Sequence, residues 1–192
     1  RPVVETMEDG HRPLAMNVGL SHYKAGEEMA RHLVARGYRE ICFAGCRIRA
    51  DYRASQRYEG FDRVLAEHQL PRRPPVVVER PTSLALGGQM LVDILASQPK
   101  IDAIFFANDD LAVGAILRAH REGIEVPGRV AIAGFNGLPA AALVTPALTT
   151  IVSPRRTIGR IAAEHLVSRI NGTTPPERRV DVSFELVARD ST

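Results

Sequence analysis

The sequence predicts an α/β fold in which a parallel sheet is flanked by helices. Short runs that are apolar at consecutive positions alternate along the chain with stretches whose apolar residues recur at helical spacing. The chain has 192 residues, of which 45% are hydrophobic and 24% are charged. A chain of this size and composition can bury a sizeable core, either as one large domain or as two small lobes.

The apolar runs are rich in Val, Ile and Phe. Strands that are covered on both faces in a parallel sheet have this pattern, because neither face meets water. We expect such strands at Glu40–Gly45, Pro75–Glu79, Asp102–Ala107, Val130–Gly134 and Leu148–Val152. A last stretch, Val180–Phe184, alternates apolar and polar residues and predicts a more exposed strand.

Amphipathic helical patterns separate the strands. In the first of them, Met29 and Leu33 fall on one face, and Gly37 follows as a stop signal. We expect helices at Lys24–Arg36, Ala54–His68, Leu84–Ala96, Leu111–Glu122 and Pro154–Ile170. Strands and helices in this order form α/β layers joined by right-handed crossovers.

Charge and cysteine content exclude several classes of function. Lys plus Arg is 25 and Asp plus Glu is 22, a formal net charge of +3, so the chain itself is not expected to bind nucleic acid. Cys42 and Cys46 have no His or Cys cluster near them, which predicts free, reduced thiols in a cytoplasmic protein and no metal site. No run reaches the roughly 18 apolar residues of a membrane span. The chain begins Arg1-Pro2 without Met or a leader pattern, so we expect a piece of something longer.

Polar side chains follow the predicted strands, and ligands of open α/β sheets bind beyond the carboxyl ends of strands. This rule gives the candidates Arg57, Thr82, Ser83, Asn108, Asn136, Ser153 and Arg155. Amide, hydroxyl and guanidinium groups suit a small polyhydroxylated or anionic molecule. Polar residues after strands also have ordinary structural explanations. Asp109 or Asp110 can be a helix N-cap, and Asn136-Gly137 can be a turn. The arginine-rich stretch with Arg47, Arg49 and Arg53 can be a solvated surface.

Signals for catalysis are poor. No G-x-G-x-x-G follows a strand, so no dinucleotide cofactor is expected, and no P-loop, G-x-S-x-G or H-E-x-x-H pattern occurs. Of the scattered histidines, only His22 is a candidate, because it precedes the first predicted helix near an expected hinge. Glu5 completes the candidate set.

Several blocks of the sequence resemble the LacI/GalR family of transcriptional regulators. They occur in family order over nearly the whole chain: Gly37–Ile41, Arg57–Phe61, Phe105–Ala115, Gly123–Gly137, Thr145–Ile151 and Glu185–Thr192. The resemblance implies a periplasmic-binding-protein-like type I fold, two α/β lobes with an effector in the cleft, effector-driven lobe closure, and a homodimer that reads operator DNA through a separate helix-turn-helix domain.

The resemblance also assigns parts of the chain to lobes. Residues 1–21 and 153–182 match part of the N-terminal lobe, and residues 22–152 and 183–192 match the C-terminal lobe. The N-terminal lobe is therefore expected to be incomplete, and the DNA-binding domain is expected to lie outside the chain.

The resemblance further implies roles for the candidates. Arg57 matches the arginine that grips effector hydroxyls or a carboxylate, and Asn108 matches the cleft asparagine. Asn136 stands where most members have aspartate, which removes a negative charge and favours an acidic effector. The Gly134–Gly137 and Asn108–Leu111 forms resemble gluconate-utilisation repressors, and with Arg57 and Arg155 they predict a sugar acid such as gluconate. Thr82 and Ser83 stand where many members carry a stacking aromatic ring, which argues against a purine.

Two alternatives stay open at this point. A periplasmic sugar-binding protein would have the same fold. A sugar-processing α/β enzyme would need a base in the cleft, for which only Asp109 and Asp110 are available.

Overall fold

The computed structural model describes residues 2–9, 16–48, 50–173 and 177–192. The chain divides into two compact units. One consists of residues 1–22 and 153–185, and the other of residues 23–152 and 186–192.

The larger unit is built around a parallel sheet. Within the described residues its strands lie in the order β4-β3-β5-β6-β7-β9, and the pairs β3–β4, β3–β5, β5–β6 and β6–β7 are parallel. The strands are β3 (Ile41–Cys46), β4 (Val76–Val78), β5 (Ala103–Phe106), β6 (Ala131–Asn136), β7 (Thr149–Val152) and β9 (Glu185–Val187). The expected fold class is confirmed.

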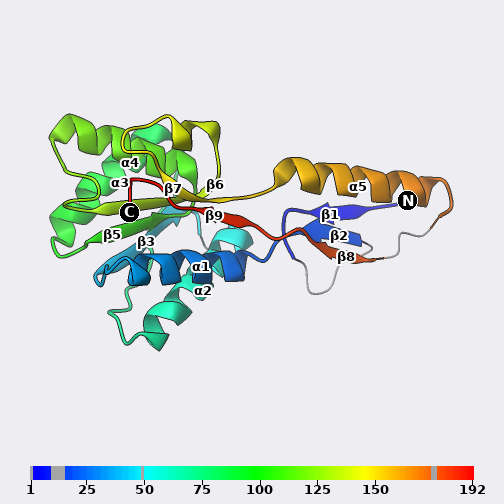
Figure 1. Ribbon diagram of the computed structural model, residues 1–192, viewed down its shortest axis with the longest axis horizontal. Helices are drawn as coiled ribbons and strands as arrows, with labels where there is room; N and C mark the ends of the chain where they lie inside the picture. The colour runs from blue at the N-terminus through cyan, green and yellow to red at the C-terminus, as the bar shows by residue number, and fades with distance from the viewer. Residues whose placement is uncertain (1, 10–15, 49, 174–176) are drawn as a thin grey trace. The chain divides into compact units, whose positions relative to one another are not determined.

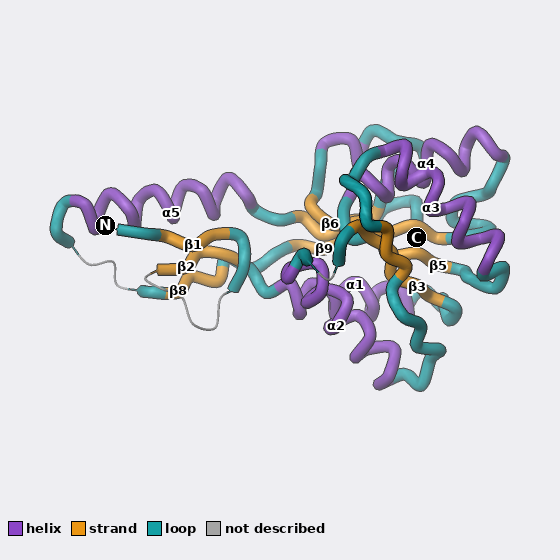
Figure 2. The backbone as a smooth tube through the Cα atoms, turned by 180° about the vertical axis from the view of Figure 1, so that it is seen from behind, coloured by secondary structure: helices purple, strands orange, loops and turns teal. Residues whose placement is uncertain are grey.

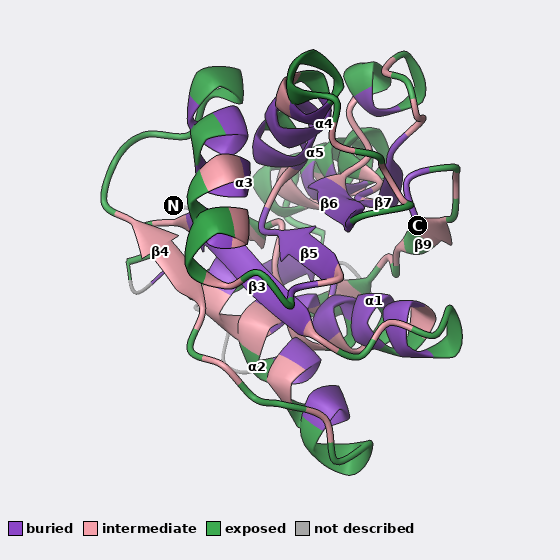
Figure 3. Ribbon diagram, turned by 90° about the vertical axis from the view of Figure 1, so that its left-hand side faces the viewer, coloured by how far each residue is buried: buried purple, intermediate pink, exposed green. Residues whose placement is uncertain are grey.

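Helices cover both faces of this sheet (Figure 1). They are α1 (His22–Ala35), α2 (Tyr52–Glu67), α3 (Leu84–Ser97) and α4 (Asp109–Glu122), with a 3-10 turn at Pro139–Ala142. Successive side chains of a strand point to opposite faces. Cys42 and Ala44 accordingly pack in the core under α3 and α4, whereas the Phe43 ring meets those of Phe61 on α2 and Phe105. Figure 3 shows that the central strands are buried along most of their length, and β3, β6 and β7 become half-buried only at their last residue.

The smaller unit has a three-stranded sheet, counted over the described residues, in the order β1-β2-β8. Its strands are β1 (Val4–Thr6), β2 (Met16–Gly19) and β8 (Arg179–Asp181), and both pairings are parallel. The long helix α5 (Arg155–Ile170) runs beside this sheet, as Figure 2 shows, and contacts β1 and β2.

The five predicted helices and the five predicted buried strands all form, each within two residues of the expected bounds at either end. The last predicted strand, Val180–Phe184, is right only for Val180 and Asp181, which belong to the largely exposed β8. Asp181 ends β8, where its Oδ1 accepts a hydrogen bond of 2.8 Å from the amide of Ser183, and Ser183 has φ +58°. This local turn interrupts the extended chain before β9 begins. Strands β1 and β2 were not predicted.

Candidate functional site

Arg57 lies at the centre of the candidate site in the larger unit. It sits on α2, after β3, and is only 5% exposed. Its Nη2 donates a hydrogen bond of 3.1 Å to the carbonyl oxygen of Ala107 at the end of β5. Its guanidinium carbon lies 4.1 Å from the centroid of the Phe135 ring on β6. Burial lowers the pKa of Arg57 to about 10, which leaves the side chain cationic at neutral pH.

Asn108 and Asn136 directly follow the two residues that Arg57 contacts, so the ends of β5 and β6 bring all three candidates into one region. Asn108 is half-buried and caps α4, because its Oδ1 accepts a 3.1 Å hydrogen bond from the amide of Leu111. Its Nδ2 donates to Thr82 Oγ1 at 3.3 Å. Thr82 therefore belongs to the same group. The neighbouring Ser83 caps α3 by accepting from the amide of Leu86.

Asn136 ends β6 in an unusual backbone conformation. Its φ is +128°, and that of the following Gly137 is +68°. A positive φ in a residue other than glycine costs about 1–3 kcal/mol and persists only where the surrounding structure supports it. The half-buried Asn136 side chain is thus held at the carboxyl end of the strand, where ligands of α/β sheets bind.

Four other candidates lie in the smaller unit. Ser153 is 4% exposed, and its Oγ has no hydrogen-bond partner among the described residues. Arg155 is exposed at the first position of α5. His22 is the first residue of α1 and not a residue before it, and its buried Nε2 lies 3.0 Å from the carbonyl oxygen of Met7. Glu5 is half-buried on β1.

The arginine-rich stretch serves mainly to start α2. Asp51 caps the helix by accepting from the amides of Arg53 and Ala54 at 3.1 and 3.2 Å. Arg47 and Arg53 are exposed, which fits a solvated surface. Arg49 lies outside the described residues.

The expected capping role of Asp109 or Asp110 is wrong, because Asn108 is the N-cap of α4. Asp110 is exposed, and Asp109 is fully buried. Asp109 accepts hydrogen bonds from Thr150 Oγ1 at 2.6 Å and from the amide of Leu138 at 2.7 Å. Burial raises the pKa of Asp109, and these hydrogen bonds oppose the rise. A carboxylate engaged in this way is not placed to act as a general base on a bound sugar.

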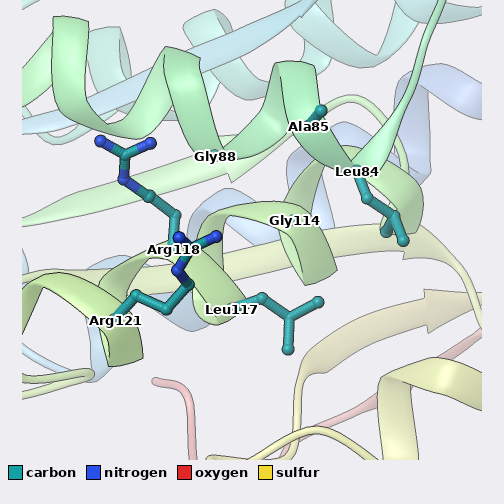
Figure 4. A pocket seen from close by; sticks show the side chains of 7 residues that line it. All are labelled: Leu84, Ala85, Gly88, Gly114, Leu117, Arg118 and Arg121. Carbon is teal, nitrogen blue, oxygen red and sulfur yellow. The ribbon is translucent and has the colours of Figure 1, made fainter.

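A separate groove lies between α3 and α4 (Figure 4), with a volume of about 260 Å³. It contains none of the predicted site residues. Leu84 and Leu117, each 47% exposed, lie along it together with Arg118 and Arg121.

Neither a metal-binding cluster nor a membrane-spanning helix is found among the residues that the structure describes. No group of three or more His, Cys, Asp or Glu side chains could hold a metal ion. No described helix is both long and apolar enough to span a bilayer. Cys42 is buried, Cys46 is half-buried, and both are free thiols.

The helix-flanked parallel sheet, with polar groups gathered where its strands end, is the architecture of a small-molecule-binding α/β domain. Residues 30–192 match the periplasmic binding protein-like domain, and the chain belongs to that family. The predicted resemblance to LacI/GalR regulators is confirmed within it.

Two curated relatives carry the name HTH-type transcriptional regulator GntR. That of Pseudomonas aeruginosa is 45% identical over 91% of this chain and 51% of its own length, and that of Escherichia coli K12 is 34% identical over 96% and 55%. A crystal structure of transcription regulator GntR from Chromobacterium violaceum has a TM-score of 0.92 at 41% identity and covers 99% of this chain and 69% of that one. The chain spans about half the length of the curated relatives it matches.

Sequence reasoning missed Phe135 and the carbonyl oxygen of Ala107, which orient Arg57. Both belong to runs that the hydrophobic pattern assigns to buried strands, so no local signal marks them. Only their position, one residue before Asn136 and Asn108 respectively, could have suggested a part in the site.

Proposed function

We propose that this chain is the effector-binding part of a LacI/GalR-type transcriptional repressor, and that its effector is a small sugar acid such as gluconate. One observation carries the proposal: a buried, cationic Arg57 lies beside two strand ends that carry neutral amides, Asn108 and Asn136. A planar guanidinium can bind a carboxylate through two parallel hydrogen bonds. Amide side chains supply both donors and acceptors for sugar hydroxyls.

The neutral Asn136 supports an acidic effector. An aspartate at that position would add a negative charge to the site, and this charge would repel the carboxylate of an acidic effector. Two relatives named GntR, one of them 45% identical, agree with this direction.

The effector site would be completed by the other candidates. We include Thr82 beside Asn108, because the Thr82 hydroxyl oxygen accepts a hydrogen bond from Asn108 Nδ2. Ser83, Ser153, Arg155, His22 and Glu5 are proposed as further effector contacts. Residues 1–21 and 153–182 are proposed as part of one lobe of the family fold, with residues 22–152 and 183–192 as the other.

Regulation would follow from lobe closure on the effector. A ligand shifts a conformational equilibrium only by binding one state better than the other, and closure around a sugar acid provides that difference. The change would be passed to operator DNA through a helix-turn-helix domain outside this chain, in a cytoplasmic protein without a cofactor.

The homodimer that the resemblance implies is also a proposal. We expect a second copy to cover the α3–α4 groove, because Leu84 and Leu117 expose apolar surface there beside Arg118 and Arg121. Leu117→Asp should lower the dimer fraction measured by sedimentation of the intact protein. An unchanged dimer in that variant would exclude this face.

Calorimetric titration of the intact protein with gluconate, phosphogluconate, galactose and ribose tests the proposed effector class. We expect binding of a sugar acid and weak or no binding of the neutral sugars. Tight binding of galactose or ribose without a response to gluconate would overturn it. Turnover of a bound sugar acid would favour an enzyme instead. The structure does not support this alternative, because Asp109 is buried and its carboxylate is hydrogen-bonded to Thr150 and Leu138.

A further inference from the structure

Asp109 is a fully buried carboxylate that the proposed effector contacts do not use. It is the first residue of α4 and directly follows Asn108. Its Oδ1 accepts from the hydroxyl of the buried Thr150 on β7 at 2.6 Å. Its Oδ2 accepts from the backbone amide of Leu138 at 2.7 Å, and the amide of Gly137 also donates to the carboxylate. The carboxylate therefore joins α4, β7 and the turn after β6.

The amides that Asp109 binds belong to the two residues after Asn136. Asn136 and Gly137 both have positive φ, a conformation that an isolated chain would seldom adopt at an asparagine. Successive backbone N–H groups in such conformations form a concavity that accepts an anion. Here the anion is a side chain of the same protein, the carboxylate of Asp109, which accepts from the amides of Gly137 and Leu138.

The neighbouring strand leaves space for this carboxylate. Gly134 on β6 pairs with Thr150 in the sheet register. A Cβ atom at Gly134 would lie 2.4 Å from Oδ1 of Asp109, a distance that atoms in contact do not reach. The three residues Asp109, Thr150 and Gly134 thus form one packed group directly beneath Asn136.

We propose that Asp109 is a positioning residue of the effector site, which fixes the Asn136–Leu138 turn and so places the Asn136 side chain relative to Asn108. The proposal rests on the proposed function, in which both amides contact the effector. It assigns Asp109 no contact with the effector, and it makes the spacing between the two amides depend on one buried side chain.

Asp109→Asn is the direct test, and Asp110→Asn is its matched control. Both variants lose one negative charge in the first turn of α4, but only Asp109 is buried and bonded to the turn. The amide can still accept from Thr150, but its NH₂ group then faces the Leu138 amide. We expect Asp109→Asn to weaken gluconate binding about tenfold or more, the order expected for one hydrogen bond to a charged group, and Asp110→Asn to change it less than about twofold.

Hydrogen exchange of the Leu138 amide, followed by NMR at a temperature where both variants are fully folded, measures the turn itself. It should accelerate in Asp109→Asn and not in Asp110→Asn. Thr150→Val should weaken binding, and Thr150→Ser, which keeps the hydroxyl, should restore it. If Thr150 had a purely structural role, Thr150→Val and Thr150→Ser proteins of equal stability would bind gluconate equally well.

The two proposals fail in distinguishable ways. If the wild-type protein binds none of the sugar acids, the proposed function is wrong, while the Leu138 exchange rate still decides whether Asp109 fixes the turn. If wild type binds gluconate and Asp109→Asn binds it equally well, or Leu138 exchange is unchanged in that variant, the positioning role is wrong.

Discussion

The guanidinium carbon of Arg57 lies over the Phe135 ring, 4.1 Å from the ring centroid. The aromatic face attracts the cation, and the attraction grows when both groups are removed from water, as here. One edge of the guanidinium is used by the carbonyl oxygen of Ala107. The ring and the carbonyl oxygen are thus two of the contacts that hold the guanidinium in place.

Replacement of Arg57 by lysine tests whether this planar fork matters beyond its charge. Lysine keeps the positive charge but cannot form two parallel hydrogen bonds to a carboxylate or lie flat on the ring. We expect Arg57→Lys to weaken gluconate binding by about ten- to a hundredfold. Arg53→Lys, an exposed position on the same helix, is the control and should leave calorimetric affinity unchanged. Equal affinities of Arg57→Lys and wild type would remove Arg57 from the site.

Replacement of Asn136 by aspartate tests the charge of the effector. The added carboxylate repels an acidic ligand, so Asn136→Asp should weaken binding of sugar acids about tenfold or more, whereas any weak affinity for galactose or ribose should stay level or rise. Thermal unfolding of the variant serves as the control for folding. If acidic and neutral ligands lose affinity in parallel, the substitution has disturbed the turn and the charge argument fails.

The core was predictable from sequence because it depends on local patterns. Residues 41–46 and 103–106 are apolar throughout, and such runs are typical of strands that are buried on both faces at the centre of a sheet. Strand β2, in contrast, is short, and its pairing with β1 and β8 depends on segments far from it in the chain. Strand β5 is equally short but apolar throughout, whereas Asn17 and Gly19 interrupt the apolar residues of β2, so its sequence does not distinguish a strand from a loop.

The roles of Asn108 and Asp109 show where sequence reasoning on the site ends. Three consecutive residues, Asn108, Asp109 and Asp110, could each cap a helix. The choice depends on which side chain meets Thr150 and Leu138, which are distant in sequence and come near only in the fold. The candidates at strand ends could therefore be named in advance, but the division between ligand contacts and supporting residues could not.

His32 predicts a dependence of stability on pH. Burial, followed by the charge of Arg36, lowers the pKa of His32 below its usual 6.5, although Glu28 opposes the shift. Its Nε2 lies 2.8 Å from Thr192 Oγ1. The unfolded chain takes up a proton near pH 6.5, whereas the folded chain resists it, so the contribution of His32 to stability is complete above pH 6.5 and is lost as the pH falls through the lowered pKa.

Urea denaturation between pH 7.5 and 5 measures this effect. The free energy of unfolding should decline below pH 6.5 in wild type and decline less in His32→Asn. His68→Asn, which alters a histidine outside this contact, should follow wild type. Identical pH profiles for wild type and His32→Asn would contradict the assignment.

The position of Arg57 also depends on how closely α1 approaches α2. At Gly26 a Cβ atom would lie 2.0 Å from the carbonyl oxygen of Arg57 itself, so no larger residue fits without moving α2. We expect Gly26→Ala to cost about 1–3 kcal/mol of stability, the usual range for overpacking, and to weaken effector binding because the guanidinium moves with its helix. Gly159→Ala is the control: nothing lies within 4 Å of a Cβ there, so alanine should stabilise α5 by about 0.5–1 kcal/mol. Thermal unfolding and calorimetric titration of both variants would separate the two effects, and a Gly26→Ala protein as stable as wild type would show that the helices can move apart without cost.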